Sequence, residues 1–173
     1  MNLKELFSDK TTKPKEKIEI VSQYILQNPA ETTTVIAFAQ NSKDAIKASC
    51  IEAFEFASRE NNAAATENWI QFAIENLSEK APRIKWESAK VIGNLAVKFP
   101  KLAEKAIPGL LSNTENDGTV VRWASAFALG EIVKLKLPIN TELIPTLEKI
   151  IEQEEKNSIK KIYQTALKKI AVK

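Results

Sequence analysis

The fold of this chain is decided by the run Val121-Arg122-Trp123-Ala124-Ser125-Ala126-Phe127-Ala128-Leu129-Gly130. Related runs open at three other places, each with a β-branched residue followed by lysine or arginine. The four openings follow one another at intervals of 38, 37 and 38 residues, and they are Ile46-Lys47, Ile84-Lys85, Val121-Arg122 and Ile159-Lys160. A fixed period of this length is typical of a solenoid, in which one pair of helices stacks on the next.

The rest of the chain predicts alternating helices around these runs. Apolar residues recur with the helical period, and proline, glycine and asparagine mark the breaks between segments. Pro82, for example, suits the first position of a helix, where its missing N–H is not needed. The predicted helices cover residues 14–27, 30–40, 44–59, 63–79, 82–99, 101–113, 118–136, 141–155 and 158–172.

The period divides the chain into units of one domain that spans residues 1–173. We predict an all-α, right-handed superhelical solenoid of about four helix pairs with an N-terminal capping helix. The segment 1–29 matches the repeat least and is assigned to the cap, as expected for the end of a stack. The four units are predicted at residues 30–60, 63–99, 101–137 and 140–172.

The first helix of each pair carries a second signal. Ile107-Pro108-Gly109-Leu110-Leu111 matches Ile144-Pro145-Thr146-Leu147-Glu148, and a proline inside a helix bends it. A bent first helix, then a straight second helix that opens with valine-arginine and reaches leucine-glycine, resembles the HEAT repeat of the armadillo-type α-solenoid family. The resemblance covers about residues 30–172, although Glu55 and Lys168 stand where that family usually has glycine. It implies a scaffolding or recognition role.

Composition excludes several functional classes. Apolar residues make up 44% and charged residues 27%, and the net charge is +3, which is ordinary for a globular protein. Cys50 is the one cysteine and there is no histidine, so a disulfide and the familiar Ser-His and Cys-His nucleophiles are excluded. There is also no glycine-rich phosphate loop, signal peptide or long apolar run. We therefore expect a cytoplasmic protein that is not an enzyme, with no metal, cofactor or membrane contact.

The second helices of HEAT-like stacks form a concave wall, and this places the candidate groove. Trp86 and Trp123 occupy matching positions 37 residues apart and are expected side by side on this wall. The alternative is that both rings pack sideways between neighbouring helices; Trp69 is assigned to the core. The groove is expected to be acidic near Glu52 and Glu55 and basic at the other end. The predicted groove residues are Trp86, Lys90, Trp123, Phe127, Lys134, Lys161 and Lys168.

The cation of each run has two interpretations. Lys47, Lys85, Arg122 and Lys160 form a regular ladder, which either pairs internally with acidic residues of neighbouring turns, such as Asp44 or Asp117, or contacts successive phosphates of a nucleic acid. The internal pairing makes these residues structural. The lysines of the last helix have the same two interpretations, a solvated face or a contact with an acidic surface.

The sequence predicts a non-enzymatic protein-binding scaffold or adaptor whose concave groove takes another protein or an extended peptide, with no small-molecule substrate. The alternative is a nucleic-acid-binding protein distantly similar to the alkylpurine DNA glycosylases, which are HEAT-like and use concave tryptophans, basic residues and a carboxylate. Here Lys90 and Phe127 stand one turn after the two tryptophans, so that carboxylate is absent. A third possibility is a subunit that binds through its convex side.

Overall fold

The computed structural model describes residues 1–171, and within them the chain is all-α. Three short 3-10 turns interrupt the helices, at Pro29–Glu31, Asn62–Ala64 and Asn76–Ser78. The α-helices of this part of the chain are α1 (Leu3–Ser8), α2 (Pro14–Gln27), α3 (Thr32–Gln40), α4 (Asp44–Glu60), α5 (Glu67–Glu75), α6 (Pro82–Leu95), α7 (Pro100–Asn113), α8 (Thr119–Val133), α9 (Asn140–Gln153) and α10 (Asn157–Ala171).

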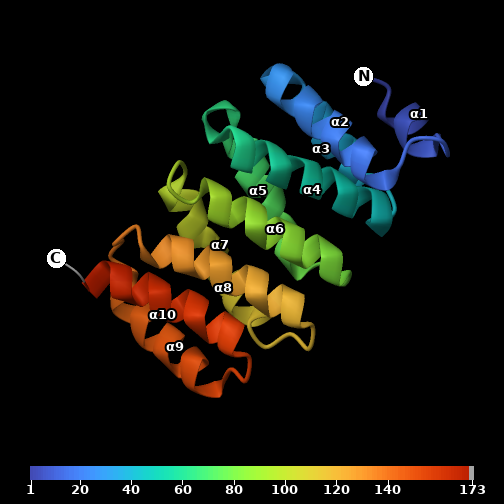
Figure 1. Ribbon diagram of the computed structural model, residues 1–173. Helices are drawn as coiled ribbons and strands as arrows, with labels where there is room; N and C mark the ends of the chain where they lie inside the picture. Colours follow the sequence, from blue (N-terminus) through green and yellow to red (C-terminus); the bar gives the residue numbers. More distant parts are fainter. Residues whose placement is uncertain (172–173) are drawn as a thin grey trace.

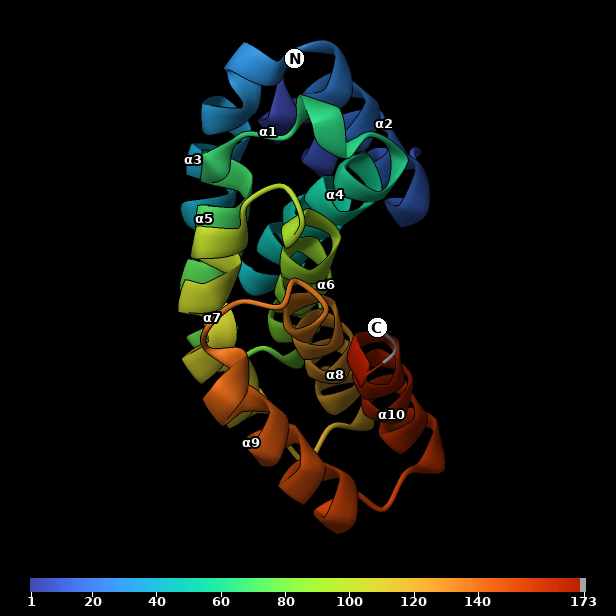
Figure 2. The same cartoon turned by 90° about the vertical axis from the view of Figure 1, so that its left-hand side faces the viewer.

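The helices form two layers that wind into a solenoid. Helices α2, α4, α6, α8 and α10 lie side by side in chain order, and α3, α5, α7 and α9 lie behind them (Figure 1). Seen along its edge, the molecule is a crescent with the first set on its inner, concave side (Figure 2). We call the layer of α2, α4, α6, α8 and α10 the inner wall. The predicted all-α solenoid is confirmed.

The inner helices pack closely because small residues recur where they meet other elements. Cys50, Ser88 and Ser125 occupy equivalent places in α4, α6 and α8, and all three are fully buried. Around them the β-branched and leucine side chains of each helix enter one continuous core, in which Trp69 is also fully buried, as predicted. Its ring contacts Phe54 edge to face, with centroids 5.2 Å apart. The periodic apolar pattern thus builds one hydrophobic spine along the stack.

Several helical segments differ from the sequence prediction, and α6 and α8 end four and three residues earlier than the predicted helices 82–99 and 118–136. The predicted helix 63–79 is shorter, because 3-10 turns flank α5 on both sides; at its end the Asn76 side chain donates to the Phe72 carbonyl at 2.7 Å and closes the helix. The helix α1 was not predicted. It is only six residues long, and Asn2 caps it by accepting a hydrogen bond from the Glu5 backbone N–H.

The N-terminal cap is itself a shortened repeat unit. The ladder cation is the fourth residue of α4, α6, α8 and α10, and the fourth residue of α2 is Lys17. Lys17 is buried, and its Nζ donates to the backbone carbonyls of Phe7, at 3.2 Å, and Asp9. The sequence pattern missed this rung because Glu16, not a β-branched residue, precedes Lys17.

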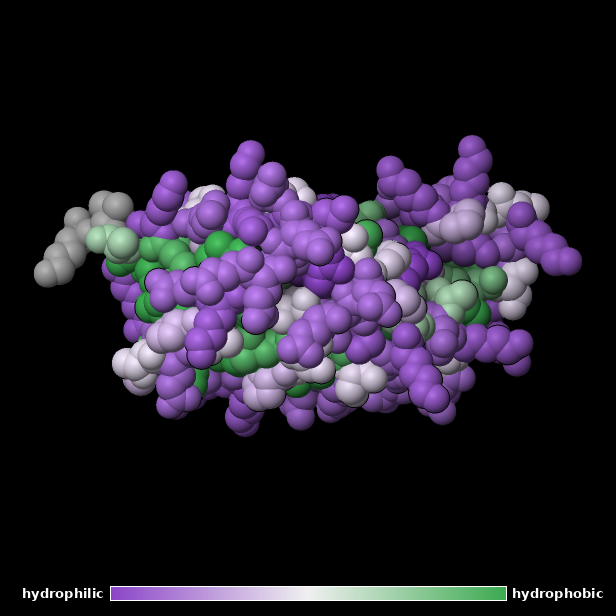
Figure 3. All heavy atoms as spheres, turned by 90° about the horizontal axis from the view of Figure 1, so that it is seen from below, coloured by the Kyte–Doolittle hydropathy of each residue, from purple (hydrophilic) through white to green (hydrophobic). Residues whose placement is uncertain are grey.

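The opposite end of the stack is open. Viewed from the α9–α10 end, apolar side chains show between the polar ones (Figure 3). A hollow at this end is lined by the apolar residues Ile144, Leu167 and Ile170 together with Glu148 and Lys168. None of the helices described for residues 1–171 combines the length and apolar character needed to cross a bilayer.

Candidate functional site

The inner wall has the same geometry at three of the places where two of its helices meet, namely α4–α6, α6–α8 and α8–α10. One residue of the earlier helix faces the later one, and these facing residues are Glu55 on α4, Gly93 on α6 and Gly130 on α8. One residue of the later helix stands opposite, and these opposing residues are Lys90 on α6, Phe127 on α8 and Thr165 on α10. The three meeting places, or junctions, fill the space between the helices in three different ways.

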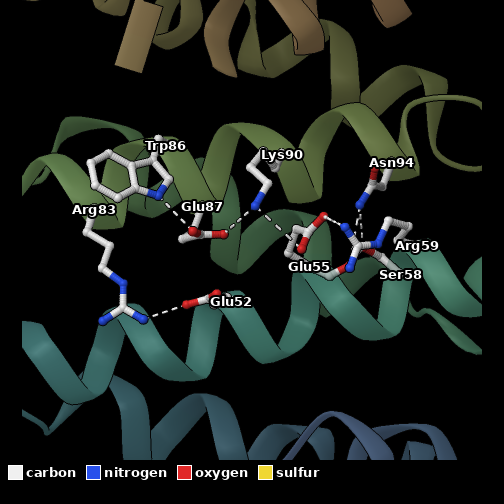
Figure 4. Close-up of polar contacts among 9 residues, drawn as sticks. All are labelled: Glu52, Glu55, Ser58, Arg59, Arg83, Trp86, Glu87, Lys90 and Asn94. Atoms are coloured by element: carbon white, nitrogen blue, oxygen red, sulfur yellow. Dashed lines mark hydrogen bonds and ion pairs between the residues drawn. The ribbon is translucent and has the colours of Figure 1, made fainter. Parts of the chain in front are cut away.

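The α4–α6 junction is ionic. The carboxylate of Glu55 is buried, with its Oε2 3.5 Å from the Nζ of Lys90 and its Oε1 3.6 Å from Nη1 of Arg59. Lys90 reaches back to a second buried carboxylate, since its Nζ lies 3.0 Å from Oε2 of Glu87 (Figure 4). One ammonium group therefore serves two buried carboxylates on neighbouring helices. Removing it would leave both without a full counter-charge.

The pKa of Glu87 shows that burial disfavours its charged carboxylate. Burial raises the pKa of the Glu87 carboxyl above its ordinary value, and the charge of Lys90 opposes that rise. The indole N–H of Trp86 donates to Glu87 at 2.7 Å, so this half-buried tryptophan caps the cluster (Figure 4). A further pair joins Glu52 to Arg83 at 2.5 Å. The junction is held by polar contacts throughout.

The expected acidic end of the groove is therefore wrong at this junction. Its three carboxylates, those of Glu52, Glu55 and Glu87, are matched by the cations of Arg59, Arg83 and Lys90. The cluster is balanced in charge because the acidic residues seen in the sequence point at cations of the neighbouring helix.

The α6–α8 junction is aromatic. The ring of Phe127 lies on the bare backbone of Gly93, so closely that a Cβ added to this glycine would stand 2.4 Å from Cε1 of the ring. Trp123 stacks on Phe127 with ring centroids 6.1 Å apart and planes 10° from parallel. Trp123 remains 41% exposed, and Val120, one turn earlier, is 51% exposed. Val120, Trp123 and Phe127 form an apolar strip along α8 on the inner wall, which we call the α8 strip.

The two tryptophans predicted to line the groove thus have different roles. Trp86 is half-buried and hydrogen-bonded within the ionic cluster, which is closer to the packing alternative. Trp123 is exposed to solvent, as the groove interpretation requires. Their identical places in the repeat do not reveal this difference, because it depends on the hydrogen bond of Trp86 with Glu87 and on the stacking of Trp123 with Phe127, which exist only in the folded chain.

The α8–α10 junction is incompletely filled. Thr165 stands opposite Gly130, and a Cβ added to this glycine would meet only ordinary contacts, at 3.4 Å from Cβ of Ala166. A hollow of about 350 Å³ remains beside them. Its lining consists of Phe127, Gly130, Glu131, Lys134, Lys161, Ile162, Thr165, Ala166 and Lys169. We call it the α8–α10 hollow.

The charge around the α8–α10 hollow is positive. Lys134 is paired with Glu131 on the same helix, whereas Lys161 and Lys169 make no ion pair among residues 1–171. Lys168, which was predicted to line the groove, instead lines the hollow at the open end of the stack. Lys169 takes its place in the α8–α10 hollow and was missed, because the prediction followed the glycine register one residue too early.

The ladder cations link each unit to the next. Nζ of Lys47 lies 2.8 Å from Oε1 of Glu79, which precedes α6. Nζ of Lys85 donates at 2.8 Å to Oδ1 of Asn113, at the end of α7. Arg122 forms two hydrogen bonds to Glu154, which follows α9, at 2.9 and 3.3 Å. The acceptors lie at or just after the end of the first helix of the following unit, so each cation fixes how two units stack.

The acceptors differ from those expected in the sequence. Asp44 and Asp117 were the suggested partners, but Arg122 meets only the backbone carbonyl of Asp117, at 3.2 Å. The true partners lie 28 to 32 residues further along, and this separation becomes short only after the units have stacked. Lys160 has no side-chain acceptor within residues 1–171, since no unit follows it there.

Hydrogen bonding at the last filled rung also shifts ionisation. The hydrogen bond with Arg122 lowers the pKa of the Glu154 carboxyl below its ordinary value, and the same bond raises the pKa of Arg122. Burial by contrast raises the pKa of the Cys50 thiol to about 12, so this thiol stays protonated. Among residues 1–171 no group of three or more Cys, Asp and Glu side chains is placed to hold a metal ion.

Known structures share this architecture. Computationally designed armadillo repeat proteins for modular peptide recognition align with a TM-score of 0.72 and 17% identity, over 96% of this chain and 80% of theirs. A chain of the CpcE and CpcF complex of phycocyanin lyase from Nostoc sp. PCC7120 aligns with a TM-score of 0.74 and 16% identity, over 95% of both chains. A designed armadillo repeat protein in complex with the peptide (KR)4 aligns with a TM-score of 0.69 and 16% identity, over 96% of this chain and 79% of its own.

These likenesses define the class of protein by its fold. No family model matches the sequence, and no curated protein matches it either. The chain nevertheless has the architecture of the armadillo-type α-solenoids over nearly its whole length. The resemblance inferred from the repeat period and from the run Val121–Gly130 is confirmed at the level of the fold.

Proposed function

We propose that this chain is a non-enzymatic scaffold that binds an extended segment of another protein on its inner wall, beside the α8 strip. The observation that carries this proposal is the exposure of Val120 and Trp123 together on the concave side. Neighbouring large apolar side chains exposed on one face are typical of a protein-binding surface. Tryptophan is also among the residues that most often dominate the binding energy of an interface.

The similar structures support this proposal by analogy. Two of them are designed armadillo repeat proteins, one made for modular peptide recognition and one in complex with a peptide. A shared fold does not carry function with it, so the α8 strip of this chain remains the main support. The concave wall offers an elongated surface along which successive residues of an extended peptide would meet successive repeats.

A nucleic-acid partner is less well supported. It would need a regular row of free cations, and three of the four predicted ladder cations are engaged within the protein, by Glu79, Asn113 and Glu154. Cations already paired release few counterions when a phosphate backbone approaches, so they add little affinity.

The proposal is tested with an arrayed library of fluorescent decapeptides and two variants. We expect a subset of peptides to bind the wild type and to bind Trp123→Ala about tenfold or more weakly, because truncation of a central tryptophan costs about 2 kcal/mol or more. The matched control is Lys105→Ala on α7, an exposed change in the outer layer, which should leave binding intact. Binding that survives in Trp123→Ala and is lost in the control would place the site on the convex side.

A further inference from the structure

We propose that the α8–α10 hollow receives a large apolar side chain of a peptide that carries acidic residues on both sides of it. This inference rests on the proposed function and specifies the ligand. It combines two observations, the hollow of about 350 Å³ beside Gly130 and Thr165 and the positive charge around it. The partner class is therefore an acidic segment with an aromatic or large aliphatic anchor.

The protein contains its own example of how such a side chain fits. At the α6–α8 junction the ring of Phe127 lies on Gly93, in contact with the glycine backbone. One repeat later the equivalent residues are Thr165 and Gly130. Ala166 and Ile162 lie in ordinary contact with the Gly130 position, and the short threonine side chain leaves a hollow beside them. A ligand side chain in this hollow would pack beside the α8–α10 junction, as Phe127 packs within the chain at the α6–α8 junction.

The walls of the hollow supply apolar contact. Phe127 borders it on the α8 side, and Ile162 and Ala166 border it on the α10 side. Burial of one large apolar side chain is worth about 1.5–3 kcal/mol, which corresponds to roughly ten- to a hundredfold in affinity. The anchor residue is thus expected to dominate the affinity of the peptide.

The charged residues that line the α8–α10 hollow determine which peptides it binds. Lys161 and Lys169 stand at the hollow without an ion pair among residues 1–171, and Lys134 is balanced by Glu131. The rim therefore carries two uncompensated positive charges. Carboxylates on either side of the anchor would meet them, whereas a lysine- or arginine-rich peptide would be repelled. Rim charges of this kind act on specificity and association rate, and their effect falls with added salt.

The test measures binding of three synthetic pentapeptides by fluorescence anisotropy. The first has phenylalanine between two pairs of acidic residues, the second has serine in place of phenylalanine, and the third has phenylalanine between two pairs of lysines. We expect the first peptide to bind most tightly and each of the others to bind about tenfold or more weakly. Equal binding of the first and third peptides would overturn the proposal.

Variants of the hollow locate the site. Thr165→Phe should fill the α8–α10 hollow with a ring of the chain itself and weaken binding of the first peptide about tenfold or more, whereas Thr165→Ser should not. Lys161→Glu with Lys169→Glu should also weaken it, in contrast to the same charge change at Lys101 and Lys105 on α7. Unchanged binding by Thr165→Phe would show that the hollow is not the site.

A second measurement does not depend on how Thr165→Phe folds. In methyl-labelled wild type the first peptide should shift the resonance of Ile162, which lines the α8–α10 hollow, and leave that of Ile144, at the open end, unmoved. The reverse pattern overturns the proposal.

The outcomes also separate this inference from the proposed function. If library peptides need Trp123 for binding, but their affinity changes neither with their charge nor with Thr165→Phe, this inference is overturned and the proposed function stands. Absence of binding by every peptide would overturn both, and tight binding of single-stranded DNA instead would assign the lysines to phosphate contacts.

Discussion

The α4–α6 and α6–α8 junctions have the same backbone arrangement and opposite chemistry. In the first, Lys90 reaches buried Glu55, and in the second, Phe127 lies on Gly93. In each case the residue opposite is matched to the one it meets, a cation to a carboxylate and a ring to a bare backbone. The comparison shows that the repeat requires a filled space and leaves the chemistry of the filling open.

The third junction shows what this freedom permits. A repeat that leaves the space partly empty, as Gly130 and Thr165 do, gives up packing energy at that place. The α4–α6 junction is closed by its own polar contacts, whereas the wall between α6 and α10 has an exposed apolar strip and an open hollow with uncompensated positive charge. Binding is expected where the exposed strip and the hollow lie together.

The largest difference between the two junctions should appear when Lys90 is replaced. Lys90→Met leaves Glu55 and Glu87 buried with less counter-charge, and the free energy of unfolding should fall by about 2–4 kcal/mol, because uncompensated buried charges are costly. Urea denaturation at neutral pH measures this loss. The control is Lys134→Met, whose partner Glu131 is more exposed, and which should cost less than about 1 kcal/mol. Similar losses in the two variants would contradict the ionic role given to the first junction.

The aromatic junction is tested by adding one methyl group at its glycine. Gly93→Ala would place a Cβ 2.4 Å from the Phe127 ring, so the ring must move, and we expect a loss of about 1–3 kcal/mol in thermal unfolding. Gly130→Ala is the matched control, because its Cβ meets nothing closer than 3.4 Å and alanine favours the helix. The control should be neutral or stabilising by up to about 1 kcal/mol. Equal losses would show that the two junctions are filled alike.

The sequence predicted most of the fold because the fold depends on local patterns. Apolar periodicity, Pro82 and the 37- to 38-residue spacing are all visible in the chain, and α2 agrees with its predicted bounds. The shortening of α5 was missed, because the side-chain hydrogen bond from Asn76 that closes it competes with an otherwise helical pattern.

The site was predicted less completely, because it depends on residues that meet only after stacking. Trp86 and Trp123 look equivalent in the sequence, but Glu87 and Phe127 give them different environments. The partners of Lys47 and Arg122 lie 32 residues away from them in the chain. The α8–α10 hollow exists because Thr165 carries a short side chain where a larger one would fill the space between α8 and α10. The repeat motif did not indicate such a gap.

The contribution of Glu154 in the ladder to the free energy of unfolding and that of Glu87 at the ionic junction should depend on pH in opposite directions. The pKa of Glu154 is lowered in the folded protein, so its contribution to stability is present above the ordinary pKa of 4.5 and is lost as pH falls through the folded value. The pKa of Glu87 is raised, so its contribution is present below 4.5 and is lost as pH rises through the folded value.

Two glutamine variants separate these effects. Glu154→Gln should lose about 1–2 kcal/mol at pH 7 and progressively less as pH falls below 4.5, because the wild type then loses its charged hydrogen bond. Relative to the wild type, Glu87→Gln should become more stable as pH rises above 4.5. Chemical denaturation between pH 3 and pH 7 measures both differences. If the stability difference between variant and wild type changed with pH in the same direction for both variants, the pKa shifts assigned to these two carboxyls would be excluded.

The smallest change in stability is expected when the ionic junction is converted into the aromatic one. Glu55→Gly with Glu87→Ala and Lys90→Phe gives α4 and α6 the residues that α6 and α8 carry at the equivalent places. Exchange of a complete buried ion cluster for apolar packing is often neutral, so the variant should unfold within about 1 kcal/mol of the wild type. Lys90→Phe alone should lose more, because both carboxylates stay buried. A triple variant that is no more stable than this single variant would show that the two junctions differ in backbone geometry as well as in their side chains.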